Sequence, residues 1–356
     1  MLALLRRICY SIYEVIIMRN MNSYLQEQAV MRRCRPQLSY DTVEAFELWQ
    51  RRAKEKLMEL LGLPLESCPL EVETDYQQSH EDFEEYRFTV QTEPGYFVPC
   101  HLLVPHLGKE KYPVTVCLSG HCTGMHIALG RAKSEEDQKS LDEWHHRAIA
   151  LRSVKEGRCA LVIEARNFGE TSVEGYGISC TESAKNAILM GRTVIGCRIW
   201  DAMRALDVLE AHFPQADLGN IVATGNSGGG TAAYYLACMD QRITAAAPSC
   251  SICDFEYSIA AMPHCLCNHI PGIRKYFEMG DLGGLIAPRE LIIAAGEKDH
   301  GFLIEGTRKS FETVKMLYEA AGVADRCALE VVDGGHFNYA DHLWNRFYEM
   351  KRNEMV

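Results

Sequence analysis

Short runs of apolar residues alternate with longer stretches of helical periodicity through most of the chain. The apolar runs cover residues 114–118, 160–163, 221–224, 245–247, 291–295 and 328–332. Because each run is continuously apolar instead of alternating with polar residues, we expect strands that are buried on both faces. The pattern therefore predicts an α/β fold, with a mostly parallel central sheet flanked by helices.

An amphipathic helix is predicted near the N-terminus, over residues 39–63. Its apolar residues recur at helical spacing, Ser39 or Asp41 would cap its start, and Gly62 would end it. We assign it to an N-terminal helical extension, residues 1–80, that packs against the body of the protein.

Residues 81–356 are predicted to form the main domain. Within it, residues 86–90 and 96–104 flank a Glu-Pro-Gly turn, which predicts an antiparallel hairpin, and a long helix is expected over residues 193–212. Residues 254–287 fit neither the helical nor the strand period. They lie between two predicted strands, so we interpret them as a cap or substrate-binding insert over the carboxyl edge of the sheet.

Composition narrows the classes of partner. The 356 residues are 47% hydrophobic and 24% charged, which is typical of a globular protein. The formal net charge of −11 argues against a nucleic acid as partner, because phosphate backbones require a clustered basic face. The sequence leaves the oligomeric state open, including a homo-oligomer.

The chain contains fifteen cysteines without a repeated spacing. An odd number in a chain of this size favours free thiols in a reducing compartment, so we expect a cytoplasmic protein. One cluster stands out, the segment His264-Cys265-Leu266-Cys267-Asn268-His269. Structural zinc sites favour about two to four residues between paired cysteines and need two such pairs. On this spacing no metal is predicted.

The first twenty residues are apolar but are interrupted by Arg6 and Arg7, so no run approaches the ~18 residues of a membrane span. No clean apolar core with a cleavage site follows, and an export signal is not favoured. Because Met18 and Met21 precede a more polar stretch, we hypothesise that translation starts at one of them and not at Met1. The mass of the native N-terminus tests this.

The strongest chemical signal is the G-x-S-x-G motif Gly225-Asn226-Ser227-Gly228-Gly229, between a predicted strand and a predicted helix. A serine on such a sharp turn has an exposed hydroxyl, and the flanking glycines allow strand and helix to approach closely. The glycines also match a relaxed dinucleotide-binding fingerprint, but they lie far from the first strand of the α/β region, where that motif belongs. Ser227 is therefore the predicted nucleophile, and no cofactor is expected.

His336 is the predicted general base. It follows the last predicted strand and two glycines, and serine, acid and histidine would then occur in the chain order typical of this motif. The predicted acid is Asp299, in the loop after the strand at 291–295, where it would orient the imidazole and stabilise its protonated form. Asp254 and Glu297 are its competitors. Asp333 lies too close to the histidine in sequence.

The loop Ser119-Gly120-His121-Cys122-Thr123-Gly124 follows the strand at 114–118 and is the candidate oxyanion loop. In this arrangement one N–H comes from that loop and the other from the residue after the nucleophile, here Gly228. The N–H of Cys122 or of His121 would supply the first, and the choice between them stays open. The side chains of Phe255, Tyr257, His264 and His269 are further candidates for lining the substrate pocket, although loop packing is the simpler role for each.

Taken together, these motifs resemble the α/β-hydrolase superfamily, in the branch described as acetyl xylan esterase-like or dienelactone hydrolase-like. The resemblance runs from about residue 49 to residue 337 and includes the turn at 93–95, residues 164–170, 191–206, 268–272 and 280–282, and the loops of Ser227, Asp299 and His336. It implies an α/β-hydrolase fold and hydrolysis of carboxylic esters without cofactor or metal. The chain departs from the family pattern at Ser119-Gly120, where relatives often have His-Gly.

The resemblance places Ser227, Asp299 and His336 on the triad positions of the family and implies small-molecule or carbohydrate esters, such as acetyl esters, as substrates. Three other functions compete. A prolyl-oligopeptidase-like peptidase shares the triad but needs a propeller domain for which this chain is too short. A non-catalytic hydrolase-fold binding protein would usually have lost a triad residue. A dienelactone hydrolase would have cysteine at position 227.

Overall fold

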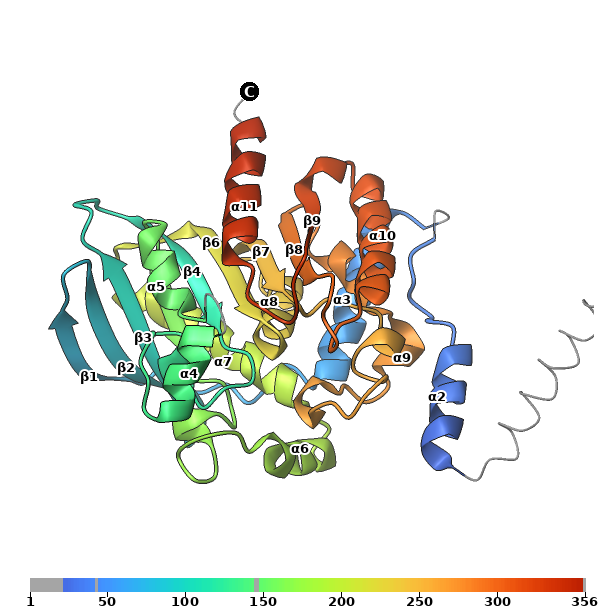
Figure 1. Ribbon diagram of the computed structural model, residues 1–356, viewed down its shortest axis with the longest axis horizontal. Coiled ribbons are helices and arrows are strands. Elements are labelled where there is room, and N and C mark those ends of the chain that lie inside the picture. Colours follow the sequence, from blue (N-terminus) through green and yellow to red (C-terminus); the bar gives the residue numbers. More distant parts are fainter. Residues whose placement is uncertain (1–21, 42–43, 144–146, 355–356) are drawn as a thin grey trace, which may run out of the picture.

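A nine-stranded sheet runs through the computed structural model of the protein, which describes residues 22–41, 44–143 and 147–354 (Figure 1). The strand order is β1-β2-β3-β5-β4-β6-β7-β8-β9. The strands are β1 (Val72–Ser79), β2 (Phe83–Glu93), β3 (Tyr96–Pro105), β4 (Tyr112–Leu118), β5 (Cys159–Ile163), β6 (Ala216–Asn226), β7 (Ile243–Ser249), β8 (Glu290–Gly296) and β9 (Cys327–Val332).

The six predicted apolar runs form strands β4 to β9, and all of these pair in parallel. The predicted hairpin is also present, as the antiparallel pair β2 and β3. β3 then pairs antiparallel with β5 and joins the hairpin to the parallel part. The prediction of a mostly parallel sheet is therefore confirmed. Strand β9 at the edge is only partly buried, whereas β8 beside it is buried throughout.

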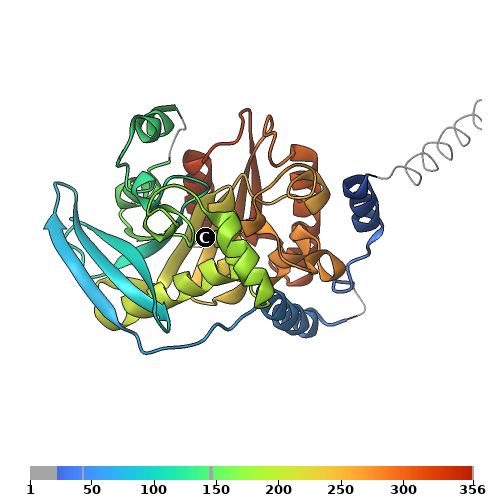
Figure 2. The ribbon, with the colours of Figure 1, turned by 90° about the horizontal axis from the view of Figure 1, so that it is seen from below.

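Helices cover both faces of the sheet (Figures 1 and 2). The longer ones are α2 (Ser23–Arg33), α3 (Phe46–Leu61), α4 (Glu135–Glu143), α5 (Ile149–Lys155), α6 (Cys180–Leu189), α7 (Val194–His212), α8 (Gly228–Met239), α10 (Ile304–Ala320) and α11 (Ala340–Glu354). Side chains alternate between the faces: Ala223 of β6 packs in the cluster that includes α3, α7, α8 and α10, and Val222 packs on α11. Helix α5 covers the β3–β5 part of the same face as α11.

The N-terminal region differs from its prediction in two places. Helix α3 begins after Ala45, which has no side-chain cap, and not at Ser39 or Asp41. The Ser39 hydroxyl instead donates to Asp281 Oδ2 at 3.0 Å, so a tertiary contact takes the place of a cap. The end at Gly62 is confirmed, with a φ of +75°. Residues 72–79, predicted to belong to the helical extension, form strand β1 on the edge of the sheet.

The predicted insert, residues 254–287, is a chain of short helical turns: η3 (Phe255–Tyr257), η4 (Leu266–Asn268), α9 (Ile273–Tyr276) and η5 (Met279–Leu285). Its second half is not a cap, because Phe277, Met279 and Leu282 are fully buried in the main hydrophobic core. Helix α2 stands at the side of the molecule, and its Gln28 amide donates to the carbonyl of Ala260 in this segment.

Two sequence predictions concern the start of translation and a membrane span. The alternative starts at Met1, Met18 and Met21 lie outside the described residues. Among the helices that the structure does describe, none is long and apolar enough to cross a membrane.

Candidate active site

Ser227 lies at the turn between β6 and α8, as predicted, and its backbone is strained. Its φ of +57° and ψ of −128° are unfavourable for a residue with a Cβ. The Ser227 N–H donates to the carbonyl of Ser249 at the end of β7, at 3.0 Å, and its own carbonyl accepts from the Thr231 N–H in the first turn of α8. The strain is therefore held by the strand and helix on either side.

The glycines of the motif are required by close backbone packing. A Cβ on Gly225 or on Gly229 would overlap the carbonyl oxygen of Leu118, at the end of β4. A Cβ on Gly120 would lie 2.5 Å from the carbonyl oxygen of Asn226 and 3.3 Å from the Ser227 Cβ. The loop after β4 therefore rests directly against the serine turn, in the place expected for an oxyanion loop.

Asp299 and His336 are joined by a hydrogen bond. The His336 Nδ1 lies 2.8 Å from Asp299 Oδ2, while Asp299 Oδ1 accepts the N–H groups of Gly301 and Phe302 at 2.7 and 3.1 Å. Burial alone would raise the pKa of Asp299, but these hydrogen bonds outweigh it and lower the pKa below its ordinary value. The carboxylate is thus charged and directs the other imidazole nitrogen, Nε2, away from itself.

The rival acids point elsewhere. Asp254 accepts the Ser310 hydroxyl at 2.7 Å and pairs with Lys309 at 3.2 Å. Glu297 and Asp333 are half or more exposed, at 52% and 73% of the side chain, and pair with surface cations. Of the four carboxylates considered from sequence, Asp299 is therefore the one placed beside His336.

Ser249 connects the serine turn with the histidine loop, a role that no sequence motif predicts. Its carbonyl accepts the Ser227 N–H, and its buried hydroxyl donates to the Phe337 carbonyl at 2.9 Å and accepts the Tyr339 N–H at 3.1 Å. Phe302 adds a second constraint, because its ring stacks on His336 at 5.7 Å between centroids. The only sequence signal for Ser249 was its place at the end of a buried strand.

The oxyanion candidates lie around Ser227. Gly228 is the first residue of α8, whose first N–H groups have no acceptor inside the helix. The His121 ring approaches it, with Nδ1 3.3 Å from the position of a Cβ on Gly228. Cys122 is buried, and its thiol donates to the Gly124 carbonyl. His121 and Cys122 directly follow Gly120, which contacts the serine turn, so both stay candidates and the choice of N–H stays open.

Glu164 holds the end of the candidate oxyanion loop, residues 119–124, by a hydrogen bond. This residue directly follows β5, and its side chain is fully buried. The carboxyl group accepts the N–H of Met125, the residue after the loop, at 3.0 Å and the N–H of Glu170 at 3.3 Å. Burial raises the pKa of Glu164 to about 8, although the two N–H groups act in the opposite direction. The folded protein therefore holds a proton here that the unfolded chain releases above about pH 4.5.

This raised pKa predicts a pH-dependent stability. The stabilisation that comes from the protonated Glu164 is fully present below the pKa that Glu164 has in the unfolded chain. It is lost as pH rises toward 8, which lowers the free energy of unfolding by an amount on the order of a few kcal/mol. Glu164→Gln cannot ionise, so we expect the variant to gain stability relative to wild type between pH 5 and pH 8.5, as measured by urea unfolding. An equal difference between the two proteins at both pH values would show that Glu164 does not take up a proton on folding.

Two groups of side chains have donor atoms close enough to share a metal ion. Cys250, Asp299 and His336 form one, but Asp299 already accepts three hydrogen bonds and burial raises the pKa of the Cys250 thiol to about 12. The other consists of His121, Cys180, Cys265 and Cys267. This second group combines Cys265 and Cys267 of the cysteine cluster with His121 and Cys180, which lie far from them in sequence. His264 and His269 of that segment do not belong to the group.

Phe255, a candidate for lining the substrate pocket, is buried in the core.

Comparison with known proteins places the fold among hydrolases. The model of the Abhydrolase family matches residues 15–331. The "Putative hydrolase YtaP" of Bacillus subtilis (strain 168) is 25% identical over 293 residues, which is 81% of this chain and 94% of that protein. Two solved structures are similar in fold. A "putative acetyl xylan esterase (BF1801)" from Bacteroides fragilis NCTC 9343 has a TM-score of 0.75 at 18% identity, over 88% of this chain and 83% of that one. A glucuronoyl esterase from Caldicellulosiruptor kristjansonii has a TM-score of 0.60 at 20% identity, over 88% of each chain.

Proposed function

Since the chain belongs to the Abhydrolase family, we propose that it is a serine hydrolase that cleaves carboxylic esters. One observation carries the proposal: a serine in a strained turn is linked through Ser249 to the loop after β9, whose histidine is oriented by a charged, buried aspartate from the loop after β8. The same arrangement of nucleophile, base and acid serves acyl transfer on several unrelated folds.

Ser227 is the proposed nucleophile and His336 the general base. Asp299 accepts the Nδ1–H of His336, which leaves Nε2 to remove the serine proton as Oγ attacks the ester carbonyl. The charged carboxylate then stabilises the imidazolium that forms. The alcohol departs with the proton that His336 returns, and water, activated by the same histidine, releases the acid from the acyl-enzyme.

The N–H groups of Gly228 and of Cys122 or His121 are the proposed oxyanion hole. They belong to the start of α8 and to the loop after β4, and these two backbone segments pack directly against each other at Gly120 and Gly229. Donors that need no rearrangement stabilise the tetrahedral oxyanion most strongly.

Short acyl groups, including acetyl esters of carbohydrates, are the proposed substrates. The His121 ring and the Asn268 amide both lie within 4 Å of the Cβ position on Gly228, which narrows the space beside the oxyanion hole. The name of the acetyl xylan esterase described above supports acetyl esters, and the name of the glucuronoyl esterase supports only the wider class of carbohydrate esters.

A chain-length series tests this function. We expect turnover of p-nitrophenyl acetate and butyrate, with kcat/KM at least about tenfold lower for the octanoate because a narrow acyl site rejects the added methylenes. Release of acetate from acetylated xylo-oligosaccharides tests the carbohydrate part. Comparable turnover of peptide p-nitroanilides would favour a peptidase instead, and no turnover of any ester would favour a binding protein.

A further inference from the structure

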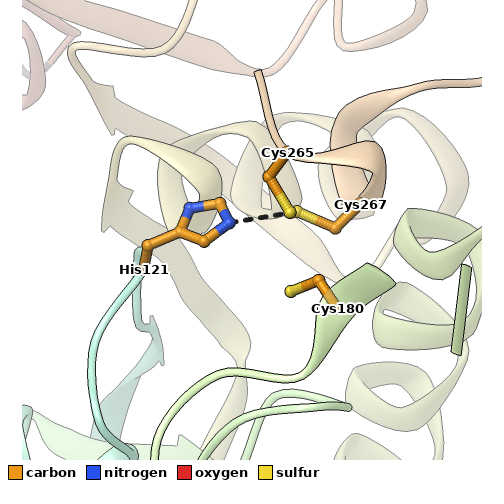
Figure 3. Close-up of side chains that lie close together, drawn as sticks. All are labelled: His121, Cys180, Cys265 and Cys267. Atoms are coloured by element: carbon orange, nitrogen blue, oxygen red, sulfur yellow. Dashed lines mark hydrogen bonds between the residues drawn. The ribbon is translucent and has the colours of Figure 1, made fainter. Parts of the chain in front are cut away.

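Four potential metal ligands meet beside the oxyanion loop, and they come from three segments far apart in the sequence (Figure 3). His121 lies in the loop after β4, Cys180 begins α6, and Cys265 and Cys267 lie at η4 in the insert. All their ligand atoms are within 4.8 Å of one another, and His121 Nε2 lies 3.3 Å from Cys267 Sγ. We propose that these four side chains bind a zinc ion.

The geometry suits a small tetrahedral ion. With Zn–S bonds of about 2.3 Å and Zn–N bonds of about 2.0 Å, neighbouring ligand atoms lie about 3.5 to 3.8 Å apart. The cluster already approaches this size, so binding requires shifts of about 1 Å or less at side-chain ends. Three thiolates and one imidazole are a donor set that selects zinc over the hard cations, and four protein ligands close the site to substrate.

The surroundings balance the charge of such a site. Three thiolates around Zn²⁺ carry a net charge of −1, which is costly to bury without a partner. Arg198 is buried next to the cluster and donates to Cys180 Sγ at 3.3 Å, and its guanidinium is fixed by the Arg166 carbonyl at 2.8 Å and by the face of Phe168. A buried cation hydrogen-bonded to a ligand sulfur is the outer-shell contact expected of a zinc–thiolate site.

The spacing of Cys265 and Cys267 alone does not predict this site, for a specific reason. The usual spacing rule applies to sites in which two local cysteine pairs supply all ligands, whereas here Cys265 and Cys267 supply two and the folded chain brings the other two. A disulfide is the rival use of these thiols. All three cysteines are free in the structure, and any disulfide among them would leave the third sulfur and His121 without a function in the cluster.

The place of the proposed zinc site gives the ion a structural role. The ion would link the insert and the start of α6, through coordination, to the loop that carries the candidate oxyanion donors. Coordination by His121 Nε2 places the ring proton on Nδ1, the nitrogen that faces Gly228. His121 would therefore act on the proposed reaction as a positioning residue, through the loop, while the zinc itself takes no part in ester cleavage.

Metal analysis of the full chain, purified without chelator, tests the site independently of any substrate. We expect about one zinc ion per chain in the wild type and in the control Cys68→Ser, whose thiol lies at the Gln91 carbonyl outside the cluster. Cys267→Ser should lose most of the zinc. If that variant does not fold, Cys265→Ser, at a partly exposed ligand, gives the same comparison.

Cobalt provides a second readout. Wild-type protein that has been stripped of metal and reduced should bind one Co²⁺ with the visible absorption of a tetrahedral thiolate site, and Cys180→Ser should weaken it. The proposal is overturned if the reduced wild type binds neither zinc nor cobalt, or if mass spectrometry of the native protein finds a disulfide among the three cysteines. Neither result bears on labelling of Ser227, so a failure of this site is distinguishable from a failure of the esterase proposal.

Discussion

Replacement of Ser227 by alanine is expected to lower kcat/KM for p-nitrophenyl acetate by about 10⁴-fold or more. Without the hydroxyl no acyl-enzyme forms, and the remaining rate comes only from the oxyanion donors and substrate binding. Because alanine fits the same volume, the fold should be retained. Removal of the side chain beyond Cβ also leaves the N–H contact with Ser249 in place.

Ser251→Ala is the matched control for this variant. Ser251 is a buried serine whose Oγ lies near the position of a Cβ on Gly230, a residue of the first turn of α8. Ser251 has no proposed role in the reaction. We expect kcat/KM of the Ser251→Ala variant to stay within about tenfold of the wild-type value. Equal losses in the two variants would indicate disturbance of the helix terminus instead of loss of a nucleophile.

Asp299→Asn should reduce kcat by about 10³- to 10⁴-fold. Asparagine can still accept the N–H groups of Gly301 and Phe302, but it carries no charge to stabilise the imidazolium and can present an NH₂ to His336. The imidazole would then favour the tautomer that cannot accept the serine proton. Steady-state kinetics at several pH values measures the loss.

Glu297→Gln and Asp254→Asn distinguish Asp299 from the other acids considered. Glu297 lies in the same loop but pairs with Arg308 at the surface, so we expect its substitution to leave kcat nearly unchanged. Asp254→Asn weakens contacts to α10 and should affect stability more than rate. A larger loss of kcat in either variant than in Asp299→Asn would contradict the assignment.

Much of the fold could be predicted because its elements have strong local signals. Continuous apolar runs identify β4 to β8, since each is buried on both faces. Thr193 marks the start of α7 because its side-chain hydroxyl accepts the Gly196 N–H, and Gly62 marks the end of α3 by its left-handed backbone. Strand β1 has no such signal. Its sequence is polar and its side chains are largely exposed, so only pairing with β2 makes it a strand.

The candidate triad could be predicted for the same reason: each residue directly follows a recognisable strand. The remaining parts depend on tertiary contacts. Ser249 acts through hydrogen bonds to residues more than twenty and nearly ninety positions away, and the sequence contains no periodicity that connects Cys180 with Cys265. The structure of the insert, residues 254–287, could not be predicted because short 3₁₀ turns have neither the helical nor the strand period. The burial of Phe277 and Leu282 in the core therefore had no signal in the sequence.

Labelling with a fluorophosphonate, located by peptide mass spectrometry, tests the central claim most directly. An activated serine reacts with this reagent without any knowledge of the natural substrate. We predict stoichiometric labelling of Ser227 in the wild type, much slower labelling in Asp299→Asn, and none in Ser227→Ala. Absence of labelling in folded wild-type protein, or labelling of a different serine, would contradict the assignment of Ser227 as the nucleophile of this protein.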